Sequence, residues 1–336
     1  MRRRSFRTLS LLAALVVVLA CQAAAPPTPT PTTAPLPTAA PSPTVAPTSA
    51  PLTIVDDEGT PTVLAAVPHT IVSLTPATTE LLFALGVGGE LRGRTDQDNY
   101  PAEATALPVV ATFEGVHIED VVGIAPDLVI AGGDNFTHSD DIARLRDLGI
   151  PVIVVYAADV NGVLADIRLI GKAVGEEQAA DGVAAAIQAR INEVSAAVAS
   201  LDRPRTFYEI GYEPDIYGPA ANSFVADMVN LAGGDPITTT DPTVYSIPLE
   251  RLVTLDPQVI VLGDAAYGTC PSAVAGRAGW AGMTAVRDGQ IRPVDDTIVT
   301  RPGPRLGEGL AALALTIHPD AAIAPPTAGA VLCPTP

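Results

Sequence analysis

The stretch from Glu176 to Leu201 has the most regular alternation of apolar and polar positions in the chain. Apolar side chains recur there at steps of three and four residues: Val183, Ile187, Ile191, Val194, Val198 and Leu201. This spacing places them on one stripe of an α-helix. Gly175 precedes the stretch and Pro204 ends it, so we predict one helix of roughly 39 Å, at about 1.5 Å per residue. A long surface helix of one domain and a rigid connection between two lobes both account for it.

Short apolar runs alternate with helical patterns on both sides of this helix. The predicted strands are 70–74, 107–111, 127–131, 151–156, 206–210 and 258–262. A helix begins with TPATTELLFALG, where Thr75 is the N-cap, Pro76 takes the first position and Gly86 ends the element. Further helices are predicted at 222–231, 249–255 and 306–316. Alternating apolar strands and helices predict parallel sheets covered on both faces.

One sequence pattern occurs twice in the chain. Residues 118–130 align without gaps onto residues 249–261, and both read as an apolar residue, a glutamate, a short amphipathic helix, a proline and a buried strand. Chance similarity of short units is the alternative. Because the copies lie on opposite sides of the long helix, the repeat favours two similar lobes with a ligand cleft between them.

The predicted fold is therefore α/β, with two Rossmann-like lobes of parallel sheet joined by a single long backbone helix. We place the lobes at residues 52–175 and 204–319, the linking helix at 176–203 and a C-terminal tail at 320–336.

The first 51 residues read as targeting segments. Basic residues 2–7 precede the apolar run 9–20, which is too short to span a bilayer. The run ends in small residues before Cys21, which resembles a bacterial lipoprotein signal and implies cleavage after residue 20 and lipidation of Cys21. An ordinary secretory signal is the alternative. Residues 21–51 are rich in proline and threonine and predict an extended tether. We expect the protein at the cell surface or in the periplasm, anchored to the membrane through lipidated Cys21.

Composition excludes some functions. The net charge of −18 argues against nucleic acid as a partner. The four histidines (His69, His117, His138 and His318) lack metal-ligand spacing, and there is no CxxC, so we expect no metal and no cofactor. A two-histidine site of His117 and His138 is the alternative. No nucleophile elbow, Walker loop or dinucleotide fingerprint is present.

Two cysteines follow Cys21. An even pair in an oxidising compartment predicts one disulfide between Cys270 and Cys333, with two free thiols as the alternative.

Several segments carry a family resemblance. They include IVSLTPATTELLFALG, IEDVVGIAPDLVIAGGDN, LAGGDPI, PLERLVTLDPQVIVL, GWAGMTAVRDGQI and RPGPRLGEGLAALALTIHP. In this order, over residues 52–319, they resemble the periplasmic substrate-binding proteins of the cobalamin and iron–siderophore importers. The resemblance implies two α/β lobes, a ligand held between them, and docking onto an ABC permease dimer with its ATPase.

The resemblance also implies roles for two glutamates. It suggests that Glu80, in TTEL, and Glu250 meet basic pockets on the transporter, where such pairs mainly steer the encounter and fix register. Glu119, the repeat mate of Glu250, is the rival of Glu80 on the first lobe.

Ligand contacts are expected on loops at strand ends. The candidates are Tyr100, Phe113, Asn135, Phe136, Tyr212, Tyr217, Tyr245 and Arg301. Aromatic side chains suit a planar macrocycle or a catecholate, and Arg301 suits a carboxylate or phosphate. The family's cobalamin binders carry tryptophans at some of these places, where Phe113 and Tyr245 stand here.

We therefore predict a monomeric, lipid-anchored substrate-binding protein that performs no chemistry. Its ligand would be a chelated metal: a corrinoid first, and an Fe(III)–siderophore or haem-type ligand second. A cell-surface hydrolase on the same fold is the alternative, and it would cluster His138 with Asp134 or Asp140 and a serine. An adhesion or scaffold domain without a cleft is a further alternative.

Overall fold

The computed structural model describes residues 51–133 and 136–327. Cys21, Asp134, Asn135 and Cys333 lie outside the described residues, as do the signal and nearly all of the tether. The described residues belong to one compact unit.

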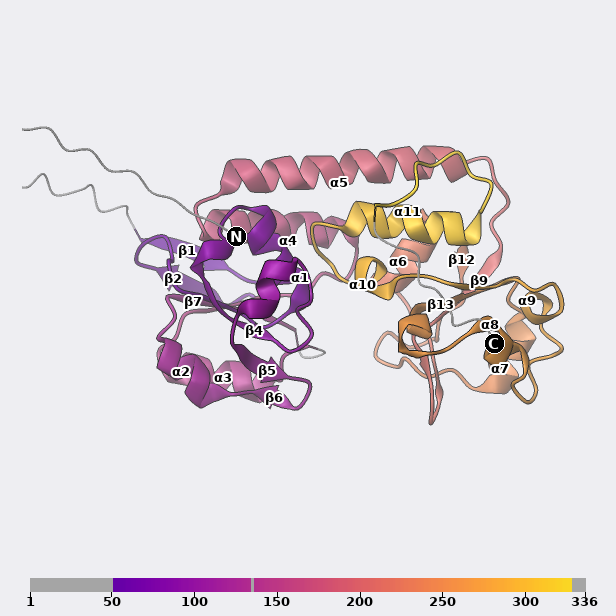
Figure 1. Cartoon of the computed structure of the whole chain (residues 1–336), viewed down its shortest axis with the longest axis horizontal. Helices are drawn as coiled ribbons and strands as arrows, with labels where there is room; N and C mark the ends of the chain where they lie inside the picture. The colour runs from indigo at the N-terminus through magenta and orange to yellow at the C-terminus, as the bar shows by residue number, and fades with distance from the viewer. Residues whose placement is uncertain (1–50, 134–135, 328–336) are drawn as a thin grey trace, which may run out of the picture. The chain divides into compact units, whose positions relative to one another are not determined.

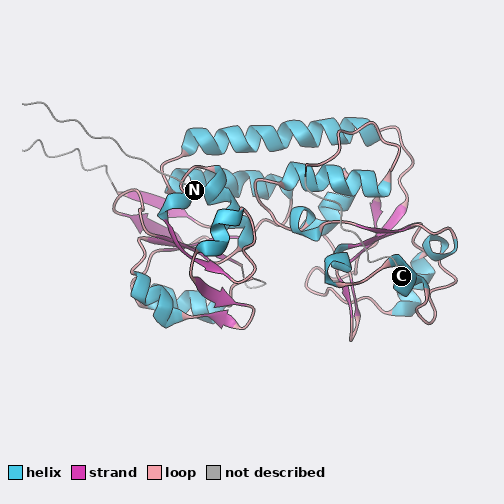
Figure 2. Ribbon diagram, viewed as in Figure 1, coloured by secondary structure: helices cyan, strands magenta, loops and turns pink. Residues whose placement is uncertain are grey.

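Helices and strands alternate along the described chain (Figures 1 and 2). The strands are β1 (Leu52–Val55), β2 (Pro61–Leu64), β3 (Ile71–Ser73), β4 (Leu91–Thr95), β5 (Val109–Thr112), β6 (Gly115–Val116), β7 (Leu128–Gly132), β8 (Val152–Val155), β9 (Arg205–Glu209), β10 (Gly211–Tyr212), β11 (Ile216–Tyr217), β12 (Asp235–Pro236), β13 (Val259–Leu262) and β14 (Ile291–Pro293). The α-helices are α1 (Pro76–Ala84), α2 (Ile118–Ile124), α3 (Ser139–Asp147), α4 (Val160–Ala173), α5 (Glu177–Val198), α6 (Phe224–Leu231), α7 (Leu249–Leu255), α8 (Pro271–Ala275), α9 (Thr284–Arg287), α10 (Asp296–Val299) and α11 (Leu306–Ile317). Short 3₁₀ turns cover Gly88–Glu90, Ala102–Ala106 and Gly263–Tyr267.

The first sheet has the strand order β6-β5-β4-β3-β7-β8. All neighbours are parallel except β5 and β6, which form an antiparallel hairpin. Alternate residues of β7 enter different cores: Leu128 and Ile130 pack with α4, whereas Val129 and Ala131 pack with α2 and α3. The sheet is therefore covered on both faces, as its apolar strands predict.

The second sheet has the order β12-β9-β13-β14 and is parallel throughout. Its strand β13 alternates in the same way, because Val259 and Val261 face one core and Ile260 and Leu262 face another. Two mainly parallel sheets with helices packed on their faces confirm the predicted α/β fold class.

The long helix is continuous, as predicted, although slightly shorter. The buried residues of α5 are Ala180, Ala184, Ile187, Ile191, Val194 and Val198. Ala180 and Ala184 are therefore buried where Val183 was expected. Leu201 lies beyond the end of the helix and is exposed. α5 packs against α4 and α11 (Figure 1). One core cluster includes residues from both sheets and from these three helices. The helix therefore forms part of a shared core and is not a bare connection.

The repeat has the same structure twice. α2 and α7 both end at a residue with positive φ before a proline, Ala125 (φ 52) and Asp256 (φ 45). The residue after this proline accepts a hydrogen bond from a backbone N–H in both copies. Asp127 Oδ2 accepts from Thr70 N, and Gln258 Oε1 accepts from Arg205 N. Each side chain thereby fixes the start of the neighbouring strand.

Candidate functional site

Aromatic side chains follow the carboxyl ends of four strands of the first sheet, two on each side of β3. Tyr100 lies beyond β4, Phe113 after β5, Phe136 after β7 and Tyr156 after β8. All four are exposed, Phe113 at 93% and Phe136 at 61%. Ligands of parallel α/β sheets bind at this edge. Tyr156 was missed by the sequence analysis, although it directly follows the apolar run PVIVV.

Two glycines make room for these rings. A Cβ on Gly132 would lie 2.7 Å from Phe136 Cβ, and one on Gly133 would lie 2.8 Å from Tyr156 Cγ. The side chains of Phe136 and Tyr156 therefore depend on the Gly-Gly pair at the end of β7.

The second sheet carries tyrosines at its carboxyl edge as well. Tyr212 follows β9, Tyr267 follows β13, and Tyr245 precedes α7. All three are exposed, and Tyr217 in β11 is partly buried. Tyr267 was also missed. The predicted aromatic residues within the described chain thus all lie near strand ends, and Asn135 lies outside it.

Tyr212 packs on a buried ion pair. The guanidinium carbon of Arg277 lies 3.7 Å from the centre of the Tyr212 ring and 4.7 Å from that of Trp280. Arg277 donates to both oxygens of Glu209, at 2.6 and 2.9 Å. Burial, and secondly the nearby Asp264, raise the pKa of Glu209 against the opposing effect of Arg277.

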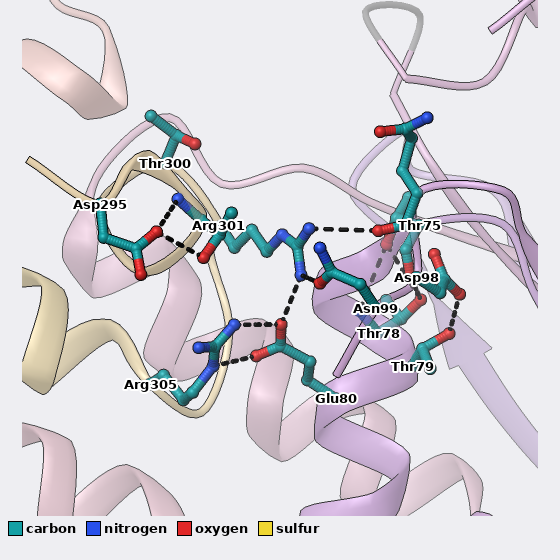
Figure 3. Close-up of polar contacts among 12 residues, drawn as sticks. Thr75, Thr78, Thr79, Glu80, Asp98, Asn99, Asp295, Thr300, Arg301 and Arg305 are labelled. Atoms are coloured by element: carbon teal, nitrogen blue, oxygen red, sulfur yellow. Dashed lines mark hydrogen bonds and ion pairs between the residues drawn. The ribbon is translucent and has the colours of Figure 1, made fainter. Parts of the chain in front are cut away.

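Glu80 lies between two arginines that come from the far end of the chain (Figure 3). Arg305 donates to both carboxylate oxygens, at 2.6 and 2.7 Å, and Arg301 donates to one of them at 2.8 Å. Arg305 also stacks on Tyr100, with its guanidinium carbon 4.2 Å from the ring centre. Arg301 further donates to Asn99 Oδ1 at 2.9 Å.

This geometry bears on the docking prediction for Glu80, which stays a prediction. Its side chain is 1% exposed and both of its oxygens are bonded within the chain. Glu119 and Glu250 are both exposed, at equivalent positions in the first turns of α2 and α7. Arg301, expected to be available for a ligand anion, is likewise engaged by Glu80 and Asn99.

The loop before Tyr100 is fixed by Asp98. This buried carboxylate accepts hydrogen bonds from the hydroxyls of Thr79 and Thr95, both at 2.5 Å (Figure 3 shows the Thr79 contact). Burial raises the pKa of Asp98, while these hydrogen bonds and Arg301 oppose the rise. The contact with Thr79 ties the loop to α1, the helix that carries Glu80.

A hollow of about 580 Å³ lies between the β5–β6 turn and the start of α3. It is lined by His117, His138, Ser139, Asp140 and Asp141 among others. His138 Nδ1 is 3.9 Å from Asp141, and His117 Nδ1 is 3.5 Å from Asp120. In the part of the chain that the structure describes, no group of three His, Cys, Asp or Glu residues could hold a metal ion.

Two further observations concern the predicted disulfide and the search for membrane-spanning helices. Cys270 forms no disulfide among the described residues, and its predicted partner Cys333 lies outside them, so the pairing stays a prediction. Within residues 51–133 and 136–327, no helix has the length and apolarity needed to cross a bilayer.

The chain belongs to the periplasmic binding protein family, whose model matches residues 71–297. This is a family of solute-binding proteins. Over 275 residues the chain is 34% identical to the "Uncharacterized ABC transporter substrate-binding lipoprotein YvrC" of Bacillus subtilis, covering 80% of this chain and 86% of that one. It is 30% identical to a cobalamin-binding protein of Halobacterium salinarum, over 95% of this chain and 86% of the relative. Among solved structures, a periplasmic haem-binding protein of Pseudomonas aeruginosa is 26% identical with a TM-score of 0.68, covering 80% of this chain and all of the other.

Proposed function

We propose that this protein is the lipid-anchored substrate-binding component of an ABC importer and that it captures a corrinoid. The observation that carries the proposal is the set of exposed aromatic side chains at the carboxyl edges of both parallel sheets. Large flat ligands bury area and stack on such rings. The similarity to a cobalamin-binding protein over nearly the whole chain supports a corrinoid as the first choice.

Haem or an Fe(III)–siderophore is the second choice. It is supported by the similarity to the haem-binding protein, and by Phe113 and Tyr245 at positions where the family resemblance implies tryptophan in cobalamin binders. Tyr100, Phe113, Phe136, Tyr212, Tyr217 and Tyr245 are the proposed contacts, together with Asn135. Arg301 would reach a ligand anion only by exchanging one of its present partners.

The proposed docking residues are Glu119 and Glu250. They occupy matching positions in the two copies of the repeat, so two equivalent basic pockets of a symmetric permease dimer can meet them together. The proposed lipid anchor is Cys21. The residues before it resemble a bacterial lipoprotein signal, and one relative is named a lipoprotein.

Mass spectrometry of small molecules that co-purify with the full-length chain tests the ligand class. A corrinoid at one equivalent per chain is the expected result. A sugar, an amino acid or a peptide found in that amount would overturn the proposal, whereas haem or a ferric siderophore would decide for the second choice.

A further inference from the structure

Two exposed tyrosines share an arrangement that recurs in the two halves of the structure. Tyr100 packs on Arg305, and Arg305 donates two hydrogen bonds to Glu80. Tyr212 packs on Arg277, and Arg277 donates two hydrogen bonds to Glu209. The tyrosines are 48% and 39% exposed, whereas the glutamate side chains are 1% and 0% exposed. Each forms a Tyr–Arg–Glu stack that runs from the surface into the protein.

The buried glutamate fixes the plane of the arginine in each stack. A guanidinium that donates two parallel hydrogen bonds to one carboxylate has little freedom to rotate. Glu209 is the last residue of β9, and β9 is paired on both sides by β12 and β13. Glu80 lies in α1, next to Thr79, which bonds Asp98 of the Tyr100 loop. Both carboxylates are therefore held by regular structure.

The arginine in turn fixes the ring above it. In the second stack the Tyr212 and Trp280 rings are nearly perpendicular, at 85°, with centres 5.9 Å apart. Arg277 lies against both rings, and Trp280 is fully buried. One face of Tyr212 is thus covered by the guanidinium and one side meets Trp280, which leaves the remaining face for solvent or a ligand.

Stability alone gives a weak reason for these buried ion pairs. Removing two charges from water costs about as much as their mutual attraction returns, so apolar replacements of buried pairs are often neutral or stabilising. An ion pair placed directly beneath an exposed ring at a strand end is better explained by the orientation that it gives to the ring.

We propose that Arg277 and Arg305 are positioning residues, which hold Tyr212 and Tyr100 as two rigid platforms for the face of a flat conjugated ring. A cation against one face of a tyrosine draws π density toward itself, so the open face suits an electron-rich ring system such as a corrin or a porphyrin. This inference rests on the proposed function and specifies how that ligand is held.

The test uses the purified full-length chain with cyanocobalamin and haemin as probes, and the dissociation constant as the readout. Glu209→Gln with Arg277→Met removes both charges of the pair together, so that neither is left without the other. Tyr212→Ala removes the platform, and Tyr212→Phe keeps its ring. We expect Tyr212→Ala and the neutral pair each to weaken binding of the bound probe about tenfold, and Tyr212→Phe, which keeps the ring, to bind more tightly than Tyr212→Ala.

A double-mutant cycle separates positioning from mere stability. If Arg277 acts through Tyr212, adding the neutral pair to Tyr212→Ala weakens binding no further. The matched control is Arg146→Met, because Arg146 also pairs with a fully buried carboxylate, Asp56, but is stacked on no ring among the described residues. It should lower stability and leave the dissociation constant unchanged.

Three outcomes overturn the inference. Wild-type affinity in the neutral-pair variant, or losses that add in the cycle, would show that Arg277 does not act through Tyr212 while leaving the proposed function intact. If the folded wild-type chain binds neither probe, the corrinoid and haem assignments fail, and the platforms fail with them.

Discussion

At the scale of single residues, Glu80 is a predicted docking residue that the structure places in a buried ion pair. Its partners Arg301 and Arg305 are separated from it by 221 and 225 residues, so no local pattern could predict the contact. The motif TTEL identifies a glutamate on a helix but does not indicate whether that glutamate faces solvent or arginine.

Glu80→Gln should lower the free energy of unfolding by about 3 to 5 kcal/mol, because it leaves two arginines without their carboxylate. Glu119→Gln changes an exposed carboxylate and should cost less than about 0.5 kcal/mol. Urea unfolding of both variants measures the difference. Equal stabilities would contradict the structural role of Glu80.

At the scale of elements, the contact between α4 and α5 depends on one glycine. A Cβ on Gly171 would lie 2.2 Å from Ala180 Cβ, so Gly171→Ala forces the helices apart and should destabilise the protein by about 1 to 3 kcal/mol. Gly182, within α5, has no atom within 4 Å of its ideal Cβ. Gly182→Ala should therefore stabilise by about 0.5 to 1 kcal/mol. Thermal unfolding of the two variants should move in opposite directions; a shift of the same sign would show that the helices are not packed in this way.

Asp166 of α4 predicts a pH-dependent contribution to stability. Burial, and secondly Asp57, raise its pKa from 3.8 to about 8. The folded state keeps a proton that the unfolded state releases above pH 4, so stability falls as the pH rises from about 4 to 8 and changes no further above that. The loss of folding stability over this pH range is at most about 6 kcal/mol. Solvent screening around the exposed Asp57 makes it smaller.

Asp166→Asn removes this loss, so its advantage over the wild type should grow between pH 4 and pH 8. Urea titrations at pH 5 and pH 8.5 measure it, with the exposed Asp147→Asn as control. A constant difference between Asp166→Asn and the wild type at the two pH values would contradict the raised pKa.

Elements were predictable where a long pattern or a repeat specified them. α5, the two copies of the helix–strand repeat and the Thr75 N-cap follow from local spacing and capping. β4 was missed because its sequence LRGRT carries two arginines, only one of which is exposed in the sheet. The hairpin β1–β2 and the edge strand β14 were missed because they are too short to show a period. In the site, Tyr100, Tyr212, Tyr217 and Tyr245 were predicted from their positions near strand ends, whereas Tyr156 and Tyr267 were missed. The arginine partners of Tyr100 and Tyr212 required the tertiary structure.

At the scale of the whole molecule, the shared core around α4, α5 and α11 favours small relative movements of the two sheets on ligand binding. Residues of both sheets enter this cluster, so a large opening would expose buried apolar area. The Glu80–Arg301–Arg305 contact adds a polar connection that any opening must break or rearrange.

If Glu119 and Glu250 are the docking residues, changing them should impair association with the permease without impairing ligand binding. Glu119→Arg with Glu250→Arg should slow association with the cognate permease dimer by at least tenfold at low salt, because it reverses the sign of both steering charges. Ligand affinity should stay unchanged. Surface plasmon resonance at two ionic strengths measures the association rate, and a rate equal to that of the wild type would exclude these two residues as the docking pair.

The most direct test of the central claim is calorimetric titration of the purified full-length chain with cyanocobalamin, haemin and a ferric catecholate siderophore. We predict that cyanocobalamin binds at one equivalent with a micromolar or tighter dissociation constant, about −8 kcal/mol or better. A folded chain that binds none of the three at micromolar concentration would contradict the account.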